Sequence, residues 1–305
     1  MTSPTSSMPL TDPRAREMVG RAVCLTGTVR TGTTLVGTLL HSMRGVEYGF
    51  EPATLFMLFL LLDRLPDEAA KLLYESYAFE ELMLNGLAGR FMNLNPHDDS
   101  SILKAKPFAE VFGRFEKSGR FAEMFDAGLN GTIAYKLPNI ISRIPLLQKL
   151  YPDTRVVVML RQPDPVAISM DRKGWYAGTL NHRDSRMLRE VDGELVPVEL
   201  PDSAVERWLK LSRFDRCYDF YRCEYEALLA LPNALIINYE SLMERPTEIT
   251  TLLAERLGLE FGVKTAEIIG QIRERSPRNI VPEGVSKDIR EEALEIHRRC
   301  ARLAI

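Results

Sequence analysis

The chain has 305 residues, of which 45% are hydrophobic, so it is long enough to bury a sizeable core. Its 39 lysines and arginines and 42 aspartates and glutamates give a net charge of −3, which argues against a nucleic-acid partner held by a broad basic surface. The four cysteines and four histidines show no metal-ligand spacing, disulfide framework or His-based triad. We therefore expect reduced thiols and no metal in a cytoplasmic protein.

The first nineteen residues differ in composition from the rest. Residues 1–19 are rich in Ser, Thr and Pro and lack an apolar targeting segment, so they are predicted to form a mobile tail. No linker divides residues 20–305, which are predicted to form a single domain. The longest apolar run, Leu55–Leu62, is far too short to cross a bilayer, and no membrane partner is expected.

Short apolar runs alternate with helical patterns along the chain, which is typical of a parallel sheet with crossover helices. Strands are predicted at 22–26, 46–50, 133–136, 155–160 and 234–238, the second being the weakest. The run at 156–160 lacks polar alternation, as expected of a strand covered on both faces. The pattern predicts a three-layer α/β fold around a mainly parallel sheet of about five strands, with helical insertions.

A glycine-containing loop, residues 27–34, lies between the first strand and the first helix. Gly27 and Gly32 have the spacing of a Walker A loop, in which backbone N–H groups and a helix N-terminus bind phosphate. Thr33, however, occupies the position of the lysine that nucleoside triphosphatases carry there. Arg30 within the loop suits a ligand whose terminal group lies along it. The pattern indicates a P-loop-type fold, and the alternative is a glycine turn that binds nothing.

Two more strands end near charged residues. Glu51 follows the weak second strand, near the carboxyl edge of the sheet and beside the loop. The alternative for Glu51 is a carboxylate that only stabilises the dipole of the next helix. Lys136 ends the third strand, where a solvated lysine is the alternative interpretation.

A second anion-binding motif directly follows the strand at 155–160. Arg161 leaves the carboxyl end of that strand, where open α/β sheets bind ligands. Asp164 is expected to cap the following helix, which places Ser169 on a side able to face the strand end. The alternative is an ordinary strand–turn–helix with a surface arginine.

Two regions interrupt the alternation of strands and helices. Residues 52–130 are largely helical, and residues 174–200 contain a charged stretch and a hairpin signal at Asp192-Gly193. We expect both insertions to form the acceptor wall and a lid.

The remaining helices follow the second insertion. An aromatic stripe predicts one core helix over 203–231, capped by Ser203 and Glu206 and ended by Pro232. A further helix is predicted from Pro246 to a stop at Gly258.

The two anion-binding motifs resemble those of PAPS-dependent sulfotransferases, where PAPS is 3′-phosphoadenosine-5′-phosphosulfate. The segment Arg30-Thr31-Gly32-Thr33-Thr34-Leu35 is similar to the family's 5′-phosphosulfate loop, Arg-Ser-Gly-Thr-Thr-Leu, and Thr31 keeps the serine hydroxyl. The segment from Arg161 to Ser169 resembles the family's 3′-phosphate motif. Tyr239, followed by Glu240, resembles the family's Arg-Tyr-Glu-Asp-Leu segment.

The candidate catalytic residues resemble particular branches of that family. Phe50-Glu51-Pro52 looks like a triplet of the carbohydrate sulfotransferases, and the position of Glu51 resembles the glutamate base of the tyrosylprotein enzymes. Lys136 resembles the lysine that stabilises the sulfonate in the tyrosylprotein enzymes. The histidine base of the steroid and phenol enzymes is absent from Tyr135-Lys136-Leu137-Pro138.

The resemblance implies transfer of a sulfuryl group from PAPS to a hydroxyl or amine of a small-molecule or glycan acceptor, without a metal. It implies Glu51 as base, with Arg30 and Lys136 stabilising charge. The implied donor-binding residues are Arg30, Thr31, Gly32, Thr33, Thr34, Leu35, Arg161, Ser169, Lys173 and Tyr239. Weaker candidates are Ser276, Arg278 and Lys287 for closing over the nucleotide, and Lys104 and Lys106 for the acceptor cleft.

Two other functions stay open at this stage. One is a P-loop kinase or NTPase acting on a small metabolite, and the other is a nucleotide-binding module without catalysis. The sequence does not identify the acceptor, distinguish O- from N-sulfation or indicate an oligomeric state.

Overall fold

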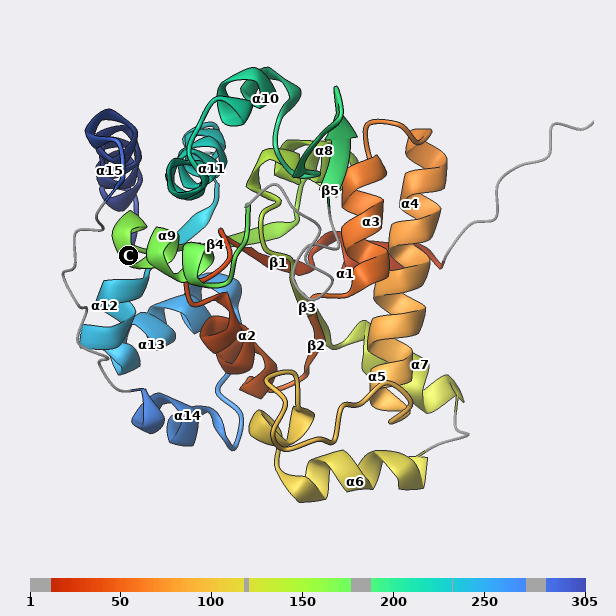
Figure 1. The fold of residues 1–305 in the computed structure, drawn as a ribbon. Helices are drawn as coiled ribbons and strands as arrows, with labels where there is room; N and C mark the ends of the chain where they lie inside the picture. The colour runs from red at the N-terminus through yellow and green to blue at the C-terminus, as the bar shows by residue number, and fades with distance from the viewer. Residues whose placement is uncertain (1–11, 118–120, 177–187, 232, 273–283) are drawn as a thin grey trace, which may run out of the picture.

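A computed structural model describes residues 12–117, 121–176, 188–231, 233–272 and 284–305. At its centre is a five-stranded sheet with the strand order β2-β3-β1-β4-β7 (Figure 1). Its strands are β1 (Val23–Thr26), β2 (Val46–Phe50), β3 (Thr132–Lys136), β4 (Arg155–Leu160) and β7 (Leu235–Asn238). All four pairings are parallel, so the five carboxyl ends lie along one edge. The prediction of a parallel α/β sheet of about five strands is confirmed.

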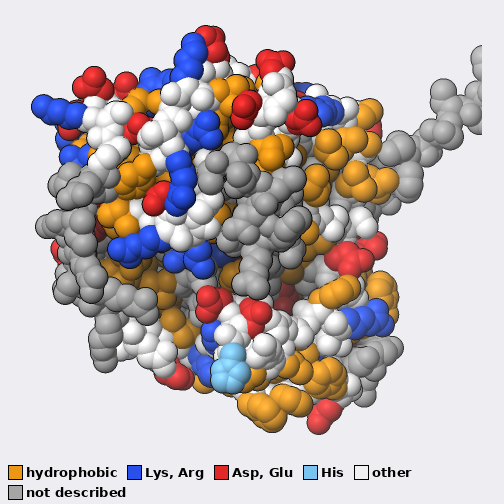
Figure 2. Space-filling view, viewed as in Figure 1, with side chains coloured by type: hydrophobic (Ala, Val, Ile, Leu, Met, Phe, Trp, Pro, Cys, Tyr) orange, Lys and Arg blue, Asp and Glu red, His pale blue; other side chains and the backbone are white. Residues whose placement is uncertain are grey.

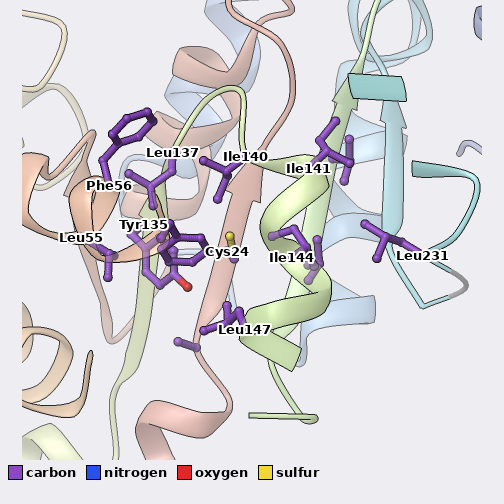
Figure 3. Packing of buried hydrophobic residues seen from close by; sticks show 14 of the residues in the cluster. Cys24, Leu55, Phe56, Tyr135, Leu137, Ile140, Ile141, Ile144, Leu147 and Leu231 are labelled. Carbon is purple, nitrogen blue, oxygen red and sulfur yellow. The ribbon is translucent and has the colours of Figure 1, made fainter. Parts of the chain in front are cut away.

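Alternating side chains of the buried strands supply two separate cores, one on each face of the sheet. In β1, Cys24 belongs to one core, whereas Val23 and Leu25 belong to the other. Figure 3 shows Cys24 and Tyr135 between side chains of α3, such as Leu55, and those of α8. Helices cover both faces, which gives the three layers that the sequence predicts.

The first core is built by α1 (Pro13–Gly20), α3 (Ala53–Leu61), α4 (Asp67–Glu75), the π-helix η1 (Ser76–Leu84), the 3₁₀ turn η3 (Ile141–Arg143), α8 (Ile144–Leu150), α9 (Pro163–Arg172), α11 (Arg213–Leu228) and α15 (Lys287–Ala301). The second is built by α2 (Thr33–Ser42), α12 (Tyr239–Glu244), α13 (Pro246–Leu257) and α14 (Thr265–Gln271). The predicted stop of α13 is confirmed, because Gly258 is a left-handed C-cap.

The predicted tail is wrong over its last part. Residues 13–20 form α1, which Asp12 caps by accepting a hydrogen bond from the Arg14 N–H. Ala15, Met18 and Val19 are buried on one side of this helix. Three small or unbranched apolar positions at helical spacing are enough to dock two turns, a weak signal among the polar residues around it. Residues 1–11 lie outside the described residues.

The single helix predicted over 203–231 is in fact two helices. They are α10 (Asp202–Leu209) and α11, which begins after Ser212. The Ser212 hydroxyl accepts a hydrogen bond from the Asp215 N–H and donates one to the Asp215 carboxylate, so the helix restarts at this serine. Ser203 caps nothing, because α10 begins after Pro201 without a side-chain cap. The aromatic stripe is nevertheless buried as predicted, and Pro232 lies outside the described part of the chain.

The first insertion contains no strand among its described residues, 52–117 and 121–130. After η1 it continues with α5 (Asn85–Leu87), η2 (Ile102–Lys104), α6 (Phe108–Lys117) and α7 (Phe121–Leu129). The inner side of α6 is anchored by Arg114, which donates to both carboxylate oxygens of Glu47 on β2. Its outer side exposes the stacked rings of Phe108 and Phe112. Hydrophobic side chains gather at the lower edge of Figure 2, where Figure 1 places α6.

The second insertion contains the predicted hairpin. Strands β5 (Leu188–Val191) and β6 (Glu194–Pro197) pair antiparallel through a turn at Asp192 and Gly193. Both turn residues have positive φ, 52° and 83°, as a tight two-residue turn requires. Among the described residues, no helix has the length and apolar character needed to traverse a lipid bilayer.

Two neighbouring carboxyl groups are buried beside this insertion. Glu199 follows β6 and accepts a hydrogen bond from the Asn139 amide, whereas Glu224 on α11 accepts one from the Ile141 N–H. Neither forms an ion pair with any residue that the structure describes. Burial raises the pKa of Glu199 to about 7. Burial, reinforced by the charge of Glu199, raises the pKa of Glu224 to about 8.

These two groups predict a pH dependence of stability. Because their pKa values are higher in the folded than in the unfolded chain, the folded protein binds more protons between about pH 5 and pH 8. The contribution of these two carboxyl groups to the free energy of unfolding should therefore fall as pH rises through this range. In urea titrations at about pH 5.5 and about pH 8.5, the double variant Glu199→Gln/Glu224→Gln should lose less stability than the parent protein, by on the order of 2 kcal/mol. Equal losses in both proteins would contradict the assignment, and Asp63→Asn, at an exposed ion pair, is the control.

Candidate active site

A residue singled out by the sequence stands at the carboxyl end of every strand of the central sheet. These are the loop 27–34 after β1, Glu51 after β2, Lys136 as the last residue of β3, Arg161 after β4 and Tyr239 after β7. Since the strands are parallel, these positions share one edge of the sheet, where open α/β folds bind ligands.

The loop after β1 has the backbone geometry of an anion-binding turn. Gly27, Arg30 and Gly32 have φ values of 143°, 72° and 97°. A Cβ at Gly27 would lie 2.7 Å from the carbonyl oxygen of Met159, and one at Gly32 would lie 2.6 Å from the ring of Tyr239. Only glycine fits either position. Gly32 precedes α2 without a side-chain cap, and the Leu35 N–H already donates to the Gly32 carbonyl at 3.0 Å. The N–H groups of Thr33 and Thr34 therefore remain available to an anion at the positive end of the helix dipole.

The loop is held from inside by buried groups. The Thr31 hydroxyl donates to the Thr28 carbonyl at 2.7 Å, and Thr31 is fully buried. The Val29 N–H donates to Oδ1 of Asn139 at 3.0 Å, and the Thr28 N–H donates to the hydroxyl of Tyr225. The hydroxyl of Thr31 is therefore occupied within the loop.

The two anion-binding motifs meet through their arginines. Arg30 Nε donates to the Ser169 hydroxyl at 2.8 Å, and Arg161 Nη1 donates to the Arg30 carbonyl at 3.0 Å. The Arg161 guanidinium also lies 4.1 Å from the ring centre of Tyr239. Nε of Arg161 is buried without a hydrogen-bond partner. The structure thus brings together four of the predicted residues from three distant parts of the chain.

Other donor-site candidates lie around this contact. Lys173 caps the C-terminus of α9, and its exposed side chain has no hydrogen bond or ion pair with residues that the structure describes. Leu35 packs partly buried against the second core, so only its backbone faces the loop. Thr33 is almost completely buried.

The second group of candidates surrounds a buried ammonium. Lys136 is only 1% exposed, and its Nζ lies 2.7 Å from Oε1 of Glu51 and 3.0 Å from the Thr34 hydroxyl. The same Nζ lies 3.8 Å from the ring centre of Phe50. Burial lowers the pKa of Lys136, and the charge of Glu51 opposes that effect. Lys136 is therefore not the solvated strand-end lysine of the alternative interpretation.

Glu51 combines strained backbone with an accessible side chain. Its φ is 47°, and its N–H donates to the Lys136 carbonyl at 3.1 Å. The side chain is 46% exposed, so the carboxylate is anchored on one side by Lys136 and open on the other. This geometry lets Glu51 accept a proton from a molecule in the open side of the site.

Two predicted residues have other roles. Lys106 is buried, and its Nζ donates to the Met43 carbonyl at 2.8 Å and lies 3.5 Å from Glu110, so the suggestion that it lines an acceptor cleft is wrong. Asp164 does not cap α9. Its carboxylate instead accepts hydrogen bonds from Arg290 and Tyr218, because the approach of α15 and α11 offers it stronger partners.

Two of the weaker candidates, Lys104 and Lys287, take no part in these contacts. Lys104 forms an ion pair with Asp99 at 3.0 Å. Lys287 begins α15. Ser276 and Arg278 lie outside the described residues.

Two residues at this edge were not predicted from the sequence. Asn139, after β3, has a φ of 60° and holds the loop through Val29. Glu240 accepts a hydrogen bond from the Gln162 N–H at 3.1 Å, beside Arg161. The signal for Asn139 was its position after Pro138 at a strand end, where asparagine readily adopts the left-handed conformation.

Comparison with known proteins places the chain in a family. The model of the Sulfotransferase family matches residues 22–262, which include the loop, Glu51, Lys136, Arg161 and Tyr239. No curated protein matches the chain significantly.

Several solved structures of bacterial sulfotransferases are similar to the chain at low identity. The sulfotransferase domain of the Synechococcus olefin synthase is 12% identical, with a TM-score of 0.49 over 92% of this chain and 94% of that one. A Mycobacterium tuberculosis sulfotransferase is 15% identical, with a TM-score of 0.42 over 90% of this chain and 76% of that one. A sulfotransferase from Alicyclobacillus acidocaldarius is 14% identical, with a TM-score of 0.41 over 92% of this chain and 93% of that one. Because the family model covers most of the chain, including every strand of the central sheet, this protein belongs to the sulfotransferase family.

Proposed function

We propose that this protein transfers the sulfuryl group of PAPS to a hydroxyl or amine of a small-molecule or glycan acceptor and releases 3′,5′-adenosine bisphosphate. The observation that carries the proposal is the contact between the loop 27–34 and the Arg161–Ser169 motif. One nucleotide with phosphate groups at both ends can span two adjacent anion-binding sites.

The loop end of this site suits the 5′-phosphosulfate. The N–H groups at the start of α2 point to the anion, and the Nη groups of Arg30 have no partner among the described residues. An arginine that is always protonated and carries forked donors suits the phosphate and sulfuryl oxygens. Arg30 would therefore neutralise the charge that grows on the 5′-phosphate as it leaves.

The other end suits the 3′-phosphate. Arg161 has a buried Nε without a partner, and Ser169 offers a hydroxyl on the adjacent helix. The side chain of Lys173, which has no partner among the described residues, extends from the end of the same helix. Tyr239 stacks on Arg161 and would border the nucleotide.

Glu51 and Lys136 are the residues that act on the reacting atoms. The acceptor oxygen or nitrogen forms a bond to sulfur while the bond from sulfur to the bridging oxygen of the 5′-phosphate breaks. The proton of the acceptor moves to the Glu51 carboxylate, whose open side faces the acceptor. Lys136, which contacts both Glu51 and Thr34 of the loop, would stabilise the transferring sulfuryl oxygens.

The two insertions are proposed as the walls of the acceptor site. The segment 52–130 starts directly after Glu51, and its Asp99 is close enough for its charge to act on Lys136. The segment 174–200 reaches the loop through the hydrogen bond between Glu199 and Asn139. A kinase or NTPase is less well supported, because the loop carries Thr33 at the position of the phosphate-binding lysine.

Arg161 gives the first test, by isothermal titration calorimetry with 3′,5′-adenosine bisphosphate and 5′-AMP. The protein should prefer the bisphosphate, and Arg161→Ala should weaken its binding by roughly 10- to 100-fold while changing that of 5′-AMP little, since a charge-assisted contact to the 3′-phosphate is lost. Arg256→Ala, on the exposed side of α13, is the control. Equal affinity of the parent protein for both nucleotides, or a stronger affinity for ATP with Mg²⁺, would refute the proposed donor.

Glu51 gives the second test, with radiolabelled PAPS and a panel of phenols, sugars and amines as acceptors. Glu51→Gln should lower kcat by roughly 10²–10⁴-fold, the usual effect of removing a general base. Binding of 3′,5′-adenosine bisphosphate should change by less than about twofold, because the carboxylate faces the acceptor. Asp63→Asn, which has a similarly exposed carboxylate in an ion pair, is the control. Full turnover by Glu51→Gln would exclude Glu51 as the base.

A further inference from the structure

Asn139 makes hydrogen bonds to the phosphate loop with both its main chain and its side chain. Its N–H donates to the Gly27 carbonyl at 2.9 Å, and its Oδ1 accepts from the Val29 N–H at 3.0 Å. Asn139 is 6% exposed, so water cannot readily replace these partners. The two bonds fix the loop on either side of Thr28, directly before Arg30.

The position of Asn139 links the loop to the rest of the candidate site. It lies three residues after Lys136, beyond the end of the same strand. Its left-handed backbone, with φ of 60°, directs both the N–H and the side chain toward the loop. Asparagine is one of the few residues with a side chain that tolerates this conformation.

The second half of the Asn139 amide is also engaged. Its Nδ2 donates to Oε1 of Glu199 at 3.4 Å, and Tyr176 interacts with both residues. Glu199 is buried and has no ion-pair partner within the described part of the chain. Because an amide has distinct donor and acceptor ends, a carboxyl that accepts from Nδ2 keeps Oδ1 turned toward Val29.

We propose that Asn139 is a positioning residue for donor binding, which holds the phosphate loop in its anion-binding shape, and that Glu199 of the second insertion orients its amide. The expected effect on nucleotide binding rests on the proposed function, whereas the expected effect on the loop does not. It makes the 174–200 insertion a support of the donor site as well as a wall of the acceptor site.

The first experiment uses Asn139→Gly, which keeps the left-handed backbone and the bond to Gly27 but removes the side chain. Without an acceptor, the Val29 N–H loses its partner in a partly buried position. In the free protein, amides in the segment 27–34 should exchange with deuterium at least about tenfold faster by mass spectrometry. The affinity for 3′,5′-adenosine bisphosphate should fall roughly 5- to 30-fold, the usual effect of one lost buried hydrogen bond.

The second experiment exchanges the amide and the carboxyl. Asn139→Asp keeps the acceptor for Val29 but places a carboxylate against Glu199, so it should weaken bisphosphate binding roughly tenfold at about pH 8. Adding Glu199→Gln supplies a new donor to that carboxylate and should recover at least about fivefold of the loss. Adding Glu224→Gln instead is the matched control, because Glu224 is a neighbouring buried carboxyl that bonds to Ile141 and not to Asn139.

The outcomes separate the positioning role from the proposed donor. Parental deuterium exchange of the loop in Asn139→Gly would overturn the role of Asn139, whatever the ligand is. Equal rescue of Asn139→Asp by Glu199→Gln and Glu224→Gln, or rescue by neither, would overturn the role of Glu199. If the parent protein binds no 3′,5′-adenosine bisphosphate, the proposed donor is wrong, and the exchange measurement still decides the role of Asn139.

Discussion

Two hydrogen bonds join the phosphate loop to the neighbouring strand end, one from Arg161 to the Arg30 carbonyl and one from Arg30 to Ser169. Both require Arg30 in the left-handed region, which costs a residue with a side chain about 1–2 kcal/mol. The surroundings offset that cost by fixing the loop on each side of the arginine. Gly27 and Gly32 allow close approach of Met159 and Tyr239. Asn139 accepts the hydrogen bond of the Val29 N–H, directly before Arg30.

A similar arrangement recurs two strands away, at Glu51 after β2. This residue also has a positive φ directly after a strand, and its side chain pairs with the buried ammonium of Lys136. Taking an ammonium out of water is costly, and Glu51, the Thr34 hydroxyl and the Phe50 ring together compensate it. Strained backbone that carries a functional side chain is typical of sites where the surrounding fold determines the geometry. Thr34 connects this group with the phosphate loop, so the proposed base and donor site form one continuous contact network.

Much of this edge could be predicted because local sequence determines it. The five strands are short apolar runs, and parallel pairing brings their carboxyl ends together whatever the details of packing. Arg30, Glu51 and Arg161 then follow from their place after a strand, whereas Lys136 and Tyr239 follow from the family resemblance. The sequence was less informative wherever tertiary contacts decide a side chain's role. Lys106 looks like any surface lysine, but the docking of α6 buries it against the Met43 carbonyl.

The sequence also offers more than one residue that could cap a helix, and the pattern alone does not show which of them does. Ser203 and Ser212 are both possible helix caps, and only the bond of Ser212 with Asp215 decides where α11 begins. Asp164 stands at a helix start, yet Arg290 on a helix far along the chain provides a bidentate partner. The role of Asn139 could not be predicted, because its three partners, Gly27, Val29 and Glu199, come from segments that only the fold brings together.

The central claim is that one adenosine nucleotide spans the loop and the Arg161 strand end. A crystal structure of the protein with 3′,5′-adenosine bisphosphate tests it most directly. The account predicts the 5′-phosphate at the N–H groups that begin α2 and the 3′-phosphate within hydrogen-bonding distance of Arg161 and Ser169. A nucleotide bound with either phosphate away from these groups would contradict it.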